Sequence, residues 1–227
     1  MDELKTNNLF NLEETLPKEL LEKFDYPFEA LKDIESYIYE LIEKLSRNEY
    51  LINGNIAFSK STVIHPSAVI KGPTIIGSQT EIRPNAYIRE NVIIGNSCVI
   101  GNSCEFKNSI IFNEAQIPHF NYVGDSIIGY NSHLGAGVIT SNLKSDKSTV
   151  TISYKGEKII TNLRKMGAII GDYTEVGCNS VLNPGTIIGK NSNIYPLSSV
   201  RGFVPENSIY KNENKIIQKM KIIHKSN

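Results

Sequence analysis

The chain has 227 residues, with 24 lysines and arginines against 24 aspartates and glutamates. This length allows one long domain with appendages. The balanced charge creates no overall field toward nucleic acid or an anionic membrane, so we expect neither as a partner. The sequence opens without the basic and apolar stretches of a signal peptide and has no apolar run of transmembrane length. We therefore expect a cytoplasmic protein.

Residues 1–50 are predicted to be helical. They contain no glycine, Pro27 stands where a helix can begin, and apolar residues recur at spacings of three and four. The apolar positions are Leu31, Ile34, Ile38, Leu41 and Leu45. This apolar stripe needs a partner. We expect it to cap the first coil of the repeat that follows, with helix pairing between subunits as the alternative.

Residues 59–206 carry a six-residue repeat. An apolar residue recurs at every sixth position, and a small or β-branched residue stands two positions before most of these. The first series is Ile64, Ile70, Ile76, Ile82, Ile88, Ile94, Ile100, Phe106 and Phe112. The second series is Ile128, Leu134, Ile170, Val176, Leu182, Ile188, Ile194 and Val200. Such self-similarity is the signature of a solenoid.

A period of six fits no helix but equals three strand periods, so each hexad forms a short strand and a corner. Three hexads make one triangular coil with the apolar residues inside, and stacked coils bury a continuous core. We expect the Gly-Asn pairs that follow strands, at Gly95 and Gly101, to adopt backbone angles that other residues resist. The predicted fold class is mainly β, a parallel β-helix with helices at both ends.

The repeat is interrupted twice, and interruptions of a local rule are candidate functional sites. The first lies between Phe112 and Ile128. The second is an insertion over residues 141–166, in which residues 149–152 and 158–161 flank a glycine turn and predict a β-hairpin.

The end of the chain is predicted to be a short amphipathic helix over residues 211–224. Its apolar residues stand between lysines and are Ile216, Ile217, Met220 and Ile223. We expect this helix to cover the last coil.

The three cysteines form no C-x-x-C pair. They are Cys98, Cys104 and Cys178. The odd number argues against a disulfide framework, so we expect reduced thiols that are mostly small buried side chains.

Few residues are candidates for a general base, because serine-triad, metalloprotease and phosphate-loop motifs are absent. Of the four histidines, His65 stands inside the regular repeat and His224 in the tail. His119 stands in the first interruption among polar and aromatic residues, which fits a positioned base as well as a structural histidine. A zinc site needs three histidines to meet, and no H-x4-H spacing occurs, so we expect no metal.

Segments 101–107, 118–125 and 128–142 resemble the acetyltransferase domain of the bifunctional glucosamine-1-phosphate acetyltransferase/N-acetylglucosamine-1-phosphate uridyltransferase. The insertion is most similar to that of archaeal-type sugar-1-phosphate nucleotidyltransferases with such a domain. The specific element is His119-x-x-Tyr122-x-Gly-Asp125 with Leu-Gly-Ala-Gly downstream. The resemblance implies left-handed coils, against the right-handed rule for parallel crossovers.

The resemblance implies acetyl transfer from acetyl-CoA to an amino-sugar 1-phosphate, in a homotrimer with active sites between subunits. His119 would be the base, and the backbone N–H of Ala136 would stabilise the thioester oxyanion. Residues implied to bind the acceptor are Arg83 and Lys107 at its phosphate, with Tyr122, His133 and Asn142. Residues implied to bind acetyl-CoA are Ala136, Cys178 and Pro196. For His133, a packed or solvent-facing role is the alternative.

The sequence departs from the family at three positions, two of them among these residues. His133 replaces an asparagine, Leu143 stands where tyrosine is common, and Cys178 aligns with a serine that faces CoA. The family's uridyltransferase domain, with its G-x-G-T-R loop, is not found, and helical residues stand in its place. We therefore expect no nucleotidyl transfer.

Three functions remain open. The first is the amino-sugar-1-phosphate N-acetyltransferase, which rests on His119, Arg83 and Lys107. The second is an acetyl-CoA-dependent acyltransferase for a nucleotide-linked amino sugar, which His133 and Leu143 favour. The third is a non-catalytic solenoid that serves as a binding or regulatory subunit.

Overall fold

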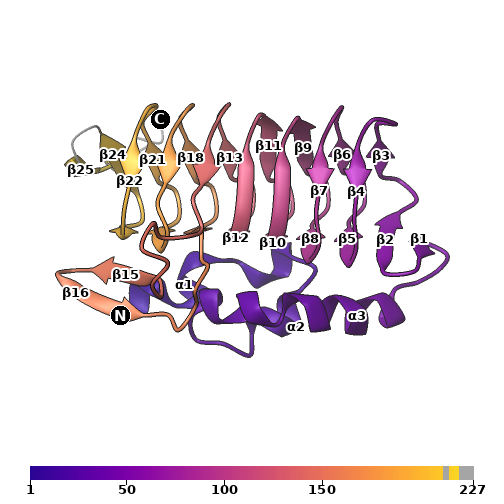
Figure 1. Cartoon of the computed structure of the whole chain (residues 1–227), viewed down its shortest axis with the longest axis horizontal. Coiled ribbons are helices and arrows are strands. Elements are labelled where there is room, and N and C mark those ends of the chain that lie inside the picture. Colours follow the sequence, from indigo (N-terminus) through magenta and orange to yellow (C-terminus); the bar gives the residue numbers. More distant parts are fainter. Residues whose placement is uncertain (212–214, 220–227) are drawn as a thin grey trace, which may run out of the picture.

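The chain forms a parallel β-solenoid of triangular coils in the computed structural model, which describes residues 1–211 and 215–219 (Figure 1). Successive coils stack their strands in parallel on three faces, and backbone hydrogen bonds join each strand to its counterpart one coil later. The predicted fold class, a mainly β parallel solenoid, is confirmed.

The first face carries β2 (Ile56–Ser59), β5 (Thr74–Ile76), β8 (Val92–Ile94), the second halves of β10 (Glu105–Ile111) and β12 (Tyr122–Ile128), β17 (Ala168–Ile170), β20 (Thr186–Ile188) and β23 (Phe203–Val204). The second face carries β3 (Val63–Ile64), β6 (Glu81–Ile82), β9 (Val99–Asn102), β11 (Gln116–His119), β13 (His133–Leu134), β18 (Glu175–Val176), β21 (Asn193–Ile194) and β24 (Ser208–Lys211). The third face carries β4 (Val69–Ile70), β7 (Tyr87–Ile88), the first halves of β10 and β12, β14 (Ile139–Thr140), β19 (Val181–Leu182) and β22 (Ser199–Val200).

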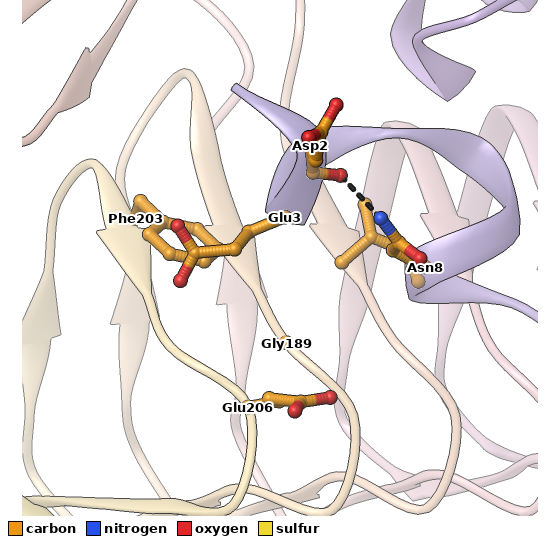
Figure 2. Close-up of a pocket in the computed structure, with 7 residues that line it drawn as sticks. Asp2, Glu3, Asn8, Gly189, Phe203 and Glu206 are labelled. Carbon is orange, nitrogen blue, oxygen red and sulfur yellow. Dashed lines mark hydrogen bonds between the residues drawn. The ribbon is translucent and has the colours of Figure 1, made fainter.

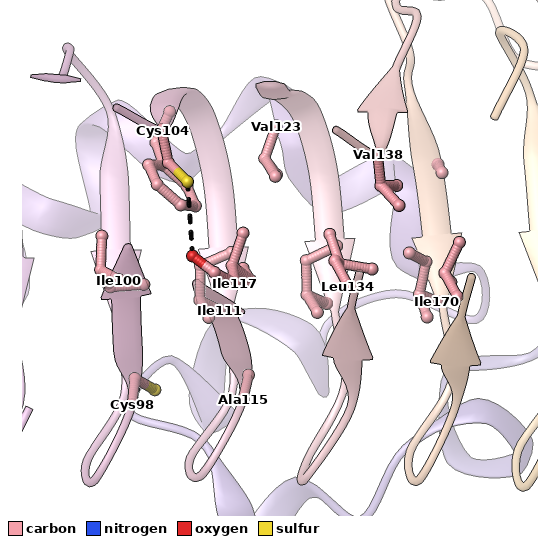
Figure 3. Packing of buried hydrophobic residues seen from close by; sticks show 14 of the residues in the cluster. Cys98, Ile100, Cys104, Ile111, Ala115, Ile117, Val123, Leu134, Val138 and Ile170 are labelled. Atoms are coloured by element: carbon pink, nitrogen blue, oxygen red, sulfur yellow. Dashed lines mark hydrogen bonds between the residues drawn. The ribbon is translucent and has the colours of Figure 1, made fainter. Parts of the chain in front are cut away.

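The core of the prism follows the hexads up to Phe106 and then changes phase (Figure 3). The next inward residues are Ile111, Ile117, Val123 and Ile128, all fully buried. Phe112 instead packs outside the prism. The sequence interpretation of an interruption between Phe112 and Ile128 is therefore wrong, because the coils continue through this segment.

Two corners between the third and first faces have lost one residue each. β10 and β12 run across them, and the single residues Asn108 and Asp125 turn the chain in the left-handed region, with φ of 46° and 48°. Asparagine and aspartate adopt this conformation more readily than other side chains. The shortened corners explain the change of phase.

The regular corners are turned by residues other than the glycines that follow the strands. Ser97 and Ser103 have positive φ, whereas Gly95 and Gly101 do not, so the expected backbone role of the Gly-Asn pairs is wrong. A Cβ on Gly101 would lie 1.7 Å from the carbonyl oxygen of Pro118 in the next coil. Glycine is needed there because the coils approach closely.

The first face is apolar on its outer side as well. The residue before each inward one is an isoleucine in six coils, and its side chain points away from the prism. These isoleucines are Ile75, Ile93, Ile110, Ile127, Ile169 and Ile187, and all are fully buried. We call them the outer isoleucine ladder.

The N-terminal segment covers the outer isoleucine ladder (Figure 1). It consists of η1 (Asp2–Leu4), α1 (Thr6–Leu9), η2 (Leu12–Glu14), α2 (Lys18–Leu21), η3 (Pro27–Lys32) and α3 (Ile34–Lys44). Helix α3 packs against β5, β8 and β10, and η3 packs against β12. The prediction that this segment caps the first coil is wrong, because the ladder offers it a far larger apolar surface along the side of the solenoid.

Two contacts fix the N-terminal segment to the coils. The ring of Phe10 stacks on that of Phe112, with centroids 4.7 Å apart. The buried carboxylate of Asp172 accepts the backbone N–H of Asn11 at 2.6 Å and that of Tyr130 at 2.9 Å. Burial raises the pKa of Asp172, and these N–H groups oppose the rise.

The insertion forms a hairpin of β15 (Thr151–Tyr154) and β16 (Glu157–Ile160), with Lys155 and Gly156 at positive φ in the turn. The hydroxyl of Tyr154 donates to Glu3 at 2.6 Å. The hairpin therefore holds the start of the N-terminal segment.

The predicted C-terminal helix is not found where the tail is described. Residues Lys215–Gln218 form β25, which pairs antiparallel with β24, and the rest of the range beyond Lys211, apart from Lys219, lies outside the described residues. The open edge of β24 supplies backbone hydrogen-bond partners that a helix would leave unused. An antiparallel β1 (Tyr50–Asn53) pairs with β2 at the other end.

Cys98 and Cys104 are small buried side chains in the core (Figure 3), whereas Cys178 is exposed. All three are free thiols, and burial raises the pKa of Cys98 to about 12. Within the described ranges, no helix combines the length and the apolar character that crossing a membrane requires.

We predict that Phe10→Ala lowers the free energy of unfolding by about 3 kcal/mol, because it removes a buried ring that seals the outer isoleucine ladder. Chemical denaturation followed by circular dichroism would measure this. The matched control is Tyr39→Ala, whose ring is 46% exposed; we expect it to change stability by less than about 0.5 kcal/mol. Equal effects of the two variants would contradict the role of Phe10.

Candidate active site

Four of the predicted site residues form one row at the corner between the second and third faces. They are His119, Ala136, Cys178 and Pro196, in successive coils. Backbone hydrogen bonds join the row. The carbonyl oxygens of His119, Ala136 and Cys178 accept the N–H groups of the residues that follow Ala136, Cys178 and Pro196, at 3.1, 2.8 and 2.9 Å respectively. The predicted base and the residues expected to bind acetyl-CoA therefore share one edge of the solenoid.

His119 ends β11, and its side chain is exposed. Its imidazole makes no hydrogen bond or ion pair with any residue in the described part of the chain. Its backbone is fixed by the buried Asn121, whose Oδ1 accepts the His119 N–H at 3.1 Å and whose Nδ2 donates to the carbonyl oxygen of Gly135 at 2.8 Å. The imidazole is thus held on a rigid corner with its ring nitrogens available to a ligand.

The backbone N–H of Ala136 has no acceptor among the described residues. At another corner, the backbone N–H at the equivalent position donates to a side-chain oxygen of the next coil. The N–H of Ser78 donates to Asn96 at 2.8 Å, and the N–H of Tyr130 donates to Asp172 at 2.9 Å. At Ala136 the residue of the next coil is Cys178, which carries no oxygen on its side chain. Ala136 is partly buried, and its N–H is available to a ligand oxygen.

The third face, which adjoins the row, carries a pair of cations. Lys107 lies in β10, and the register between β7 and β10 places Arg89 one coil before it. Arg89 contacts Glu105 at 3.0 Å, and Lys107 contacts Glu90 at 3.4 Å. The N–H of Glu90 itself, and then Arg89 and Lys107, hold the pKa of that carboxyl below its usual value.

Arg83 does not lie beside Lys107 within one chain. It follows β6 at the corner between the second and third faces, where it pairs with Glu81 at 3.2 Å. Arg89, which the sequence analysis missed, occupies the position that was expected of Arg83. The signal that identifies Arg89 is its distance of one full coil, eighteen residues, from Lys107.

Tyr122 and Asn142 meet on the third face. The Nδ2 of Asn142 donates to the Tyr122 hydroxyl at 3.2 Å and to the carboxylate of Asp125 at 2.5 Å. Burial, and secondly the charge of Asp125, raise the pKa of Tyr122, so the phenol stays protonated at neutral pH. Because its oxygen accepts from Asn142, its proton is free for a ligand.

His133 lies apart from these residues, on the second face. It is part of β13, and its Nδ1 lies 2.8 Å from a carboxylate oxygen of Glu175 in the next coil. Within one chain it therefore does not meet Lys107. No three histidine, cysteine, aspartate or glutamate side chains gather into a metal-binding cluster in the described ranges; the expectation of a metal-free reaction stays a prediction.

A cavity of about 250 Å³ lies between the N-terminal segment and the last coils (Figure 2). Its lining includes the carboxylates of Asp2, Glu3 and Glu206. This negative lining does not suit a phosphate-bearing acceptor. The candidate site therefore remains the corner row and the adjoining third face.

The chain is similar to known proteins in sequence and in fold. The family model described as the GMPPB C-terminal domain matches residues 70–162. The bifunctional protein GlmU of Methanococcus maripaludis is 39% identical over 198 residues, which are 86% of this chain and 48% of that protein. The chain is similar to the C-terminal half of GlmU. The resemblance seen in the sequence is therefore confirmed.

A bifunctional sugar-1-phosphate nucleotidylyltransferase/acetyltransferase of Sulfurisphaera tokodaii is 37% identical over 102 residues, 45% of this chain and 25% of that protein. The chain thus spans about half or less of the length of these relatives.

The solved structure of the Francisella novicida UDP-N-acetylglucosamine acyltransferase superposes with a TM-score of 0.52 at 16% identity, over 72% of this chain and 65% of that one. At such low identity the match shows the fold alone. The chain shares the left-handed β-helix of these acyltransferases, as the resemblance implied.

Proposed function

We propose that this protein transfers an acetyl group from acetyl-CoA to the amine of an amino-sugar 1-phosphate, with His119 as the general base. The observation that carries the proposal is the corner row, in which a free imidazole and a free backbone N–H, that of Ala136, stand in adjacent coils beside a cationic face. The similarity to GlmU and to a protein named as an acetyltransferase supports it.

The residue types suit the chemistry. An ammonium group is no nucleophile, so His119 removes a proton from the amine as its nitrogen attacks the thioester carbon. The new C–N bond forms and the carbonyl oxygen takes the negative charge. When this oxyanion collapses, the C–S bond breaks, and the leaving sulfur of CoA takes up the proton that His119 received from the amine, which gives the free thiol. A fixed donor such as the Ala136 N–H stabilises that oxyanion by roughly 3 kcal/mol.

The small residues of the corner row support acetyl-CoA as the acetyl donor. Ala136, Cys178 and Pro196 place no long side chain along this edge, so an extended molecule has room beside the coils. Two backbone groups, the N–H of Ala136 and the N–H of Cys178, find no acceptor within the described ranges. They are available to the polar groups of the donor.

The third face supplies the acceptor contacts in this proposal. Arg89 and Lys107 match a dianionic phosphate, and the phenol of Tyr122 and the amide of Asn142 offer hydrogen bonds to sugar hydroxyls. We place Arg83 outside this phosphate contact. His133 stands on a different face, so a site that uses both His133 and Lys107 requires two copies of the chain.

His119→Ala tests the assigned base. We expect CoA release from acetyl-CoA and glucosamine 1-phosphate to fall by about 10²–10⁴-fold, because general base catalysis contributes on this order. Galactosamine 1-phosphate and UDP-linked amino sugars, assayed in parallel, identify the acceptor. The matched control is His65→Ala, a histidine whose Nδ1 contacts only Ser67 at 2.9 Å. Undiminished turnover in His119→Ala would sink the proposal.

Arg89→Ala and Arg83→Ala form a matched pair. We expect Arg89→Ala to raise the KM for the sugar phosphate about tenfold, because it removes a charge-assisted contact to the phosphate. Arg83→Ala should leave this KM within about twofold of the wild-type value. If steady-state kinetics instead gave the larger increase in KM for Arg83→Ala, the phosphate contact would have to be assigned to Arg83.

We predict a homotrimer in solution. The third face of one copy would then adjoin the second face of the next, which brings Lys107 and His133 into one site. Light scattering should give a mass three times that of the 25.3 kDa chain. A monomeric mass at assay concentrations would contradict this.

A further inference from the structure

The second shortened corner carries an aspartate where the neighbouring coils carry asparagine. The register between the strands places Asn108 one coil before Asp125 and Asn91 two coils before it. All three residues have positive φ, of 46°, 48° and 64° respectively. Asn142 stands at the same spacing one coil later. Because asparagine satisfies the backbone of this corner in two coils, the carboxylate of Asp125 needs a reason other than the turn.

The carboxylate of Asp125 is buried without a cation. The residue is 6% exposed and forms no ion pair with any part of the chain that the structure describes. Two amides compensate it: the Nδ2 of Asn108 donates to one oxygen at 2.9 Å, and the Nδ2 of Asn142 donates to the other at 2.5 Å. A buried carboxylate without a counter-charge is costly. A residue kept at such a cost is a candidate for a functional role.

Asp125 determines which way the amide of Asn142 faces. A carboxylate only accepts hydrogen bonds, whereas an amide donates from one side and accepts on the other. In a stack of three asparagines, the middle amide would accept from Asn108 and donate to the Oδ1 of Asn142. Asp125 accepts from both neighbours instead, so Asn142 turns its Nδ2 inward. Its Oδ1 receives no hydrogen bond from a residue within the described ranges.

Gly124 makes room for the second contact of Asn142. The Nδ2 of Asn142 also donates to the Tyr122 hydroxyl at 3.2 Å. A Cβ on Gly124 would lie 2.5 Å from that hydroxyl oxygen and 2.9 Å from the Nδ2 of Asn142, so a larger residue would displace both groups. The N–H of Gly124 donates to the Oγ1 of Thr140 at 2.9 Å, which fixes the backbone there.

Tyr122 and Asn142 together present one donor and one acceptor to a ligand. The phenol proton is free because the Tyr122 oxygen accepts from Asn142, and the Oδ1 of Asn142 is free to accept. A hydroxyl group can accept from the first and donate to the second at once, whereas a phosphate oxygen could use only the first. This pair therefore suits a sugar hydroxyl, and the phosphate stays with Arg89 and Lys107.

We propose that Asp125 is a positioning residue of the acceptor site, which orients the amide of Asn142 so that its Oδ1, together with the Tyr122 hydroxyl, binds one hydroxyl group of the sugar. Gly124 supports the same arrangement by leaving space for both groups. The inference rests on the proposed function for the class of the acceptor.

Asp125→Asn tests the inference, because asparagine fits this corner and restores the continuous stack of amides. We expect the Tm to stay within about 3 °C of the wild-type value. The Oδ1 of Asn142 then accepts from the new amide and is lost to the ligand. Calorimetry with glucosamine 1-phosphate, without acetyl-CoA, should show binding weakened by about tenfold.

A double-mutant cycle separates positioning from a general effect on the fold. Asn142→Ala should weaken binding by at least as much as Asp125→Asn, and the double variant should bind within about twofold of Asn142→Ala alone. The matched control is Asn108→Gly, which removes the other donor to Asp125 at a φ that glycine adopts readily. We expect it to lower the Tm and to leave sugar-phosphate binding within about twofold of the wild type.

Three results would overturn the inference. The first is binding by Asp125→Asn within about twofold of the wild type. The second is a further loss of about tenfold when Asp125→Asn is added to Asn142→Ala. The third is that the wild type binds none of glucosamine 1-phosphate, galactosamine 1-phosphate and UDP-linked amino sugars, which would also reject the acceptor class.

The outcomes also separate this inference from the proposed reaction. Sugar-phosphate binding that Asp125→Asn weakens, without acetyl transfer by the wild type, keeps the positioning role and rejects the reaction. Acetyl transfer with a KM for the sugar phosphate that Asp125→Asn does not change keeps the reaction and rejects the positioning role.

Discussion

The burial of the outer isoleucine ladder under the N-terminal segment is the interaction on which the rest of the structure depends. It makes the strands of the first face apolar on both sides, as in Thr74–Ile76, where all three residues are buried. It also fixes the N-terminal segment along the side of the solenoid, so that η3 reaches the shortened corners. Without this cover Lys32 would not lie beside Asn108 and Asp125 at these corners.

Much of this fold could be predicted from the hexads. Each hexad contributes one strand with an inward residue and one corner, so the spacing of the apolar residues gives the order of the strands around the coils. The outer isoleucine ladder was visible too, as Ile-Ile pairs 17 or 18 residues apart on either side of the insertion. A search for a six-residue repeat conceals this longer period, which spans three hexads. Phe112 was wrongly predicted to point into the prism because it stands six residues after Phe106. The lost residue before Ile111 cannot be seen in the sequence, because Ile110, Ile111 and Phe112 form an unbroken apolar run. The tail alternates apolar and basic residues in a manner that suits a strand edge as well as a helix.

The candidate site was predictable where it follows the repeat and unpredictable where it does not. His119, Ala136, Cys178 and Pro196 occupy one position of successive coils, so one assignment fixes them all. The pairing of Arg83 with Lys107 is wrong within one chain because twenty-four residues are four hexads, which is one coil plus one face, so the two side chains lie on different faces. Lys32 and Arg164 line one hollow only because segments remote in sequence pack together, which no local pattern encodes.

The site arises where the solenoid loses residues rather than where it is interrupted. Removing one residue at Asn108 and one at Asp125 lets β10 and β12 cross the corner, and it leaves the side chains of these two residues as the polar floor of a hollow. The side chain of Asn108 then donates to the carbonyl oxygen of Leu31 on one side, and the backbone carbonyl oxygen of Asp125 accepts the N–H of Gly167 on the other. A regular corner would place an extra residue there and separate both segments from Tyr122. The two deletions thus couple the N-terminal segment and the insertion to the face that we assign to the acceptor.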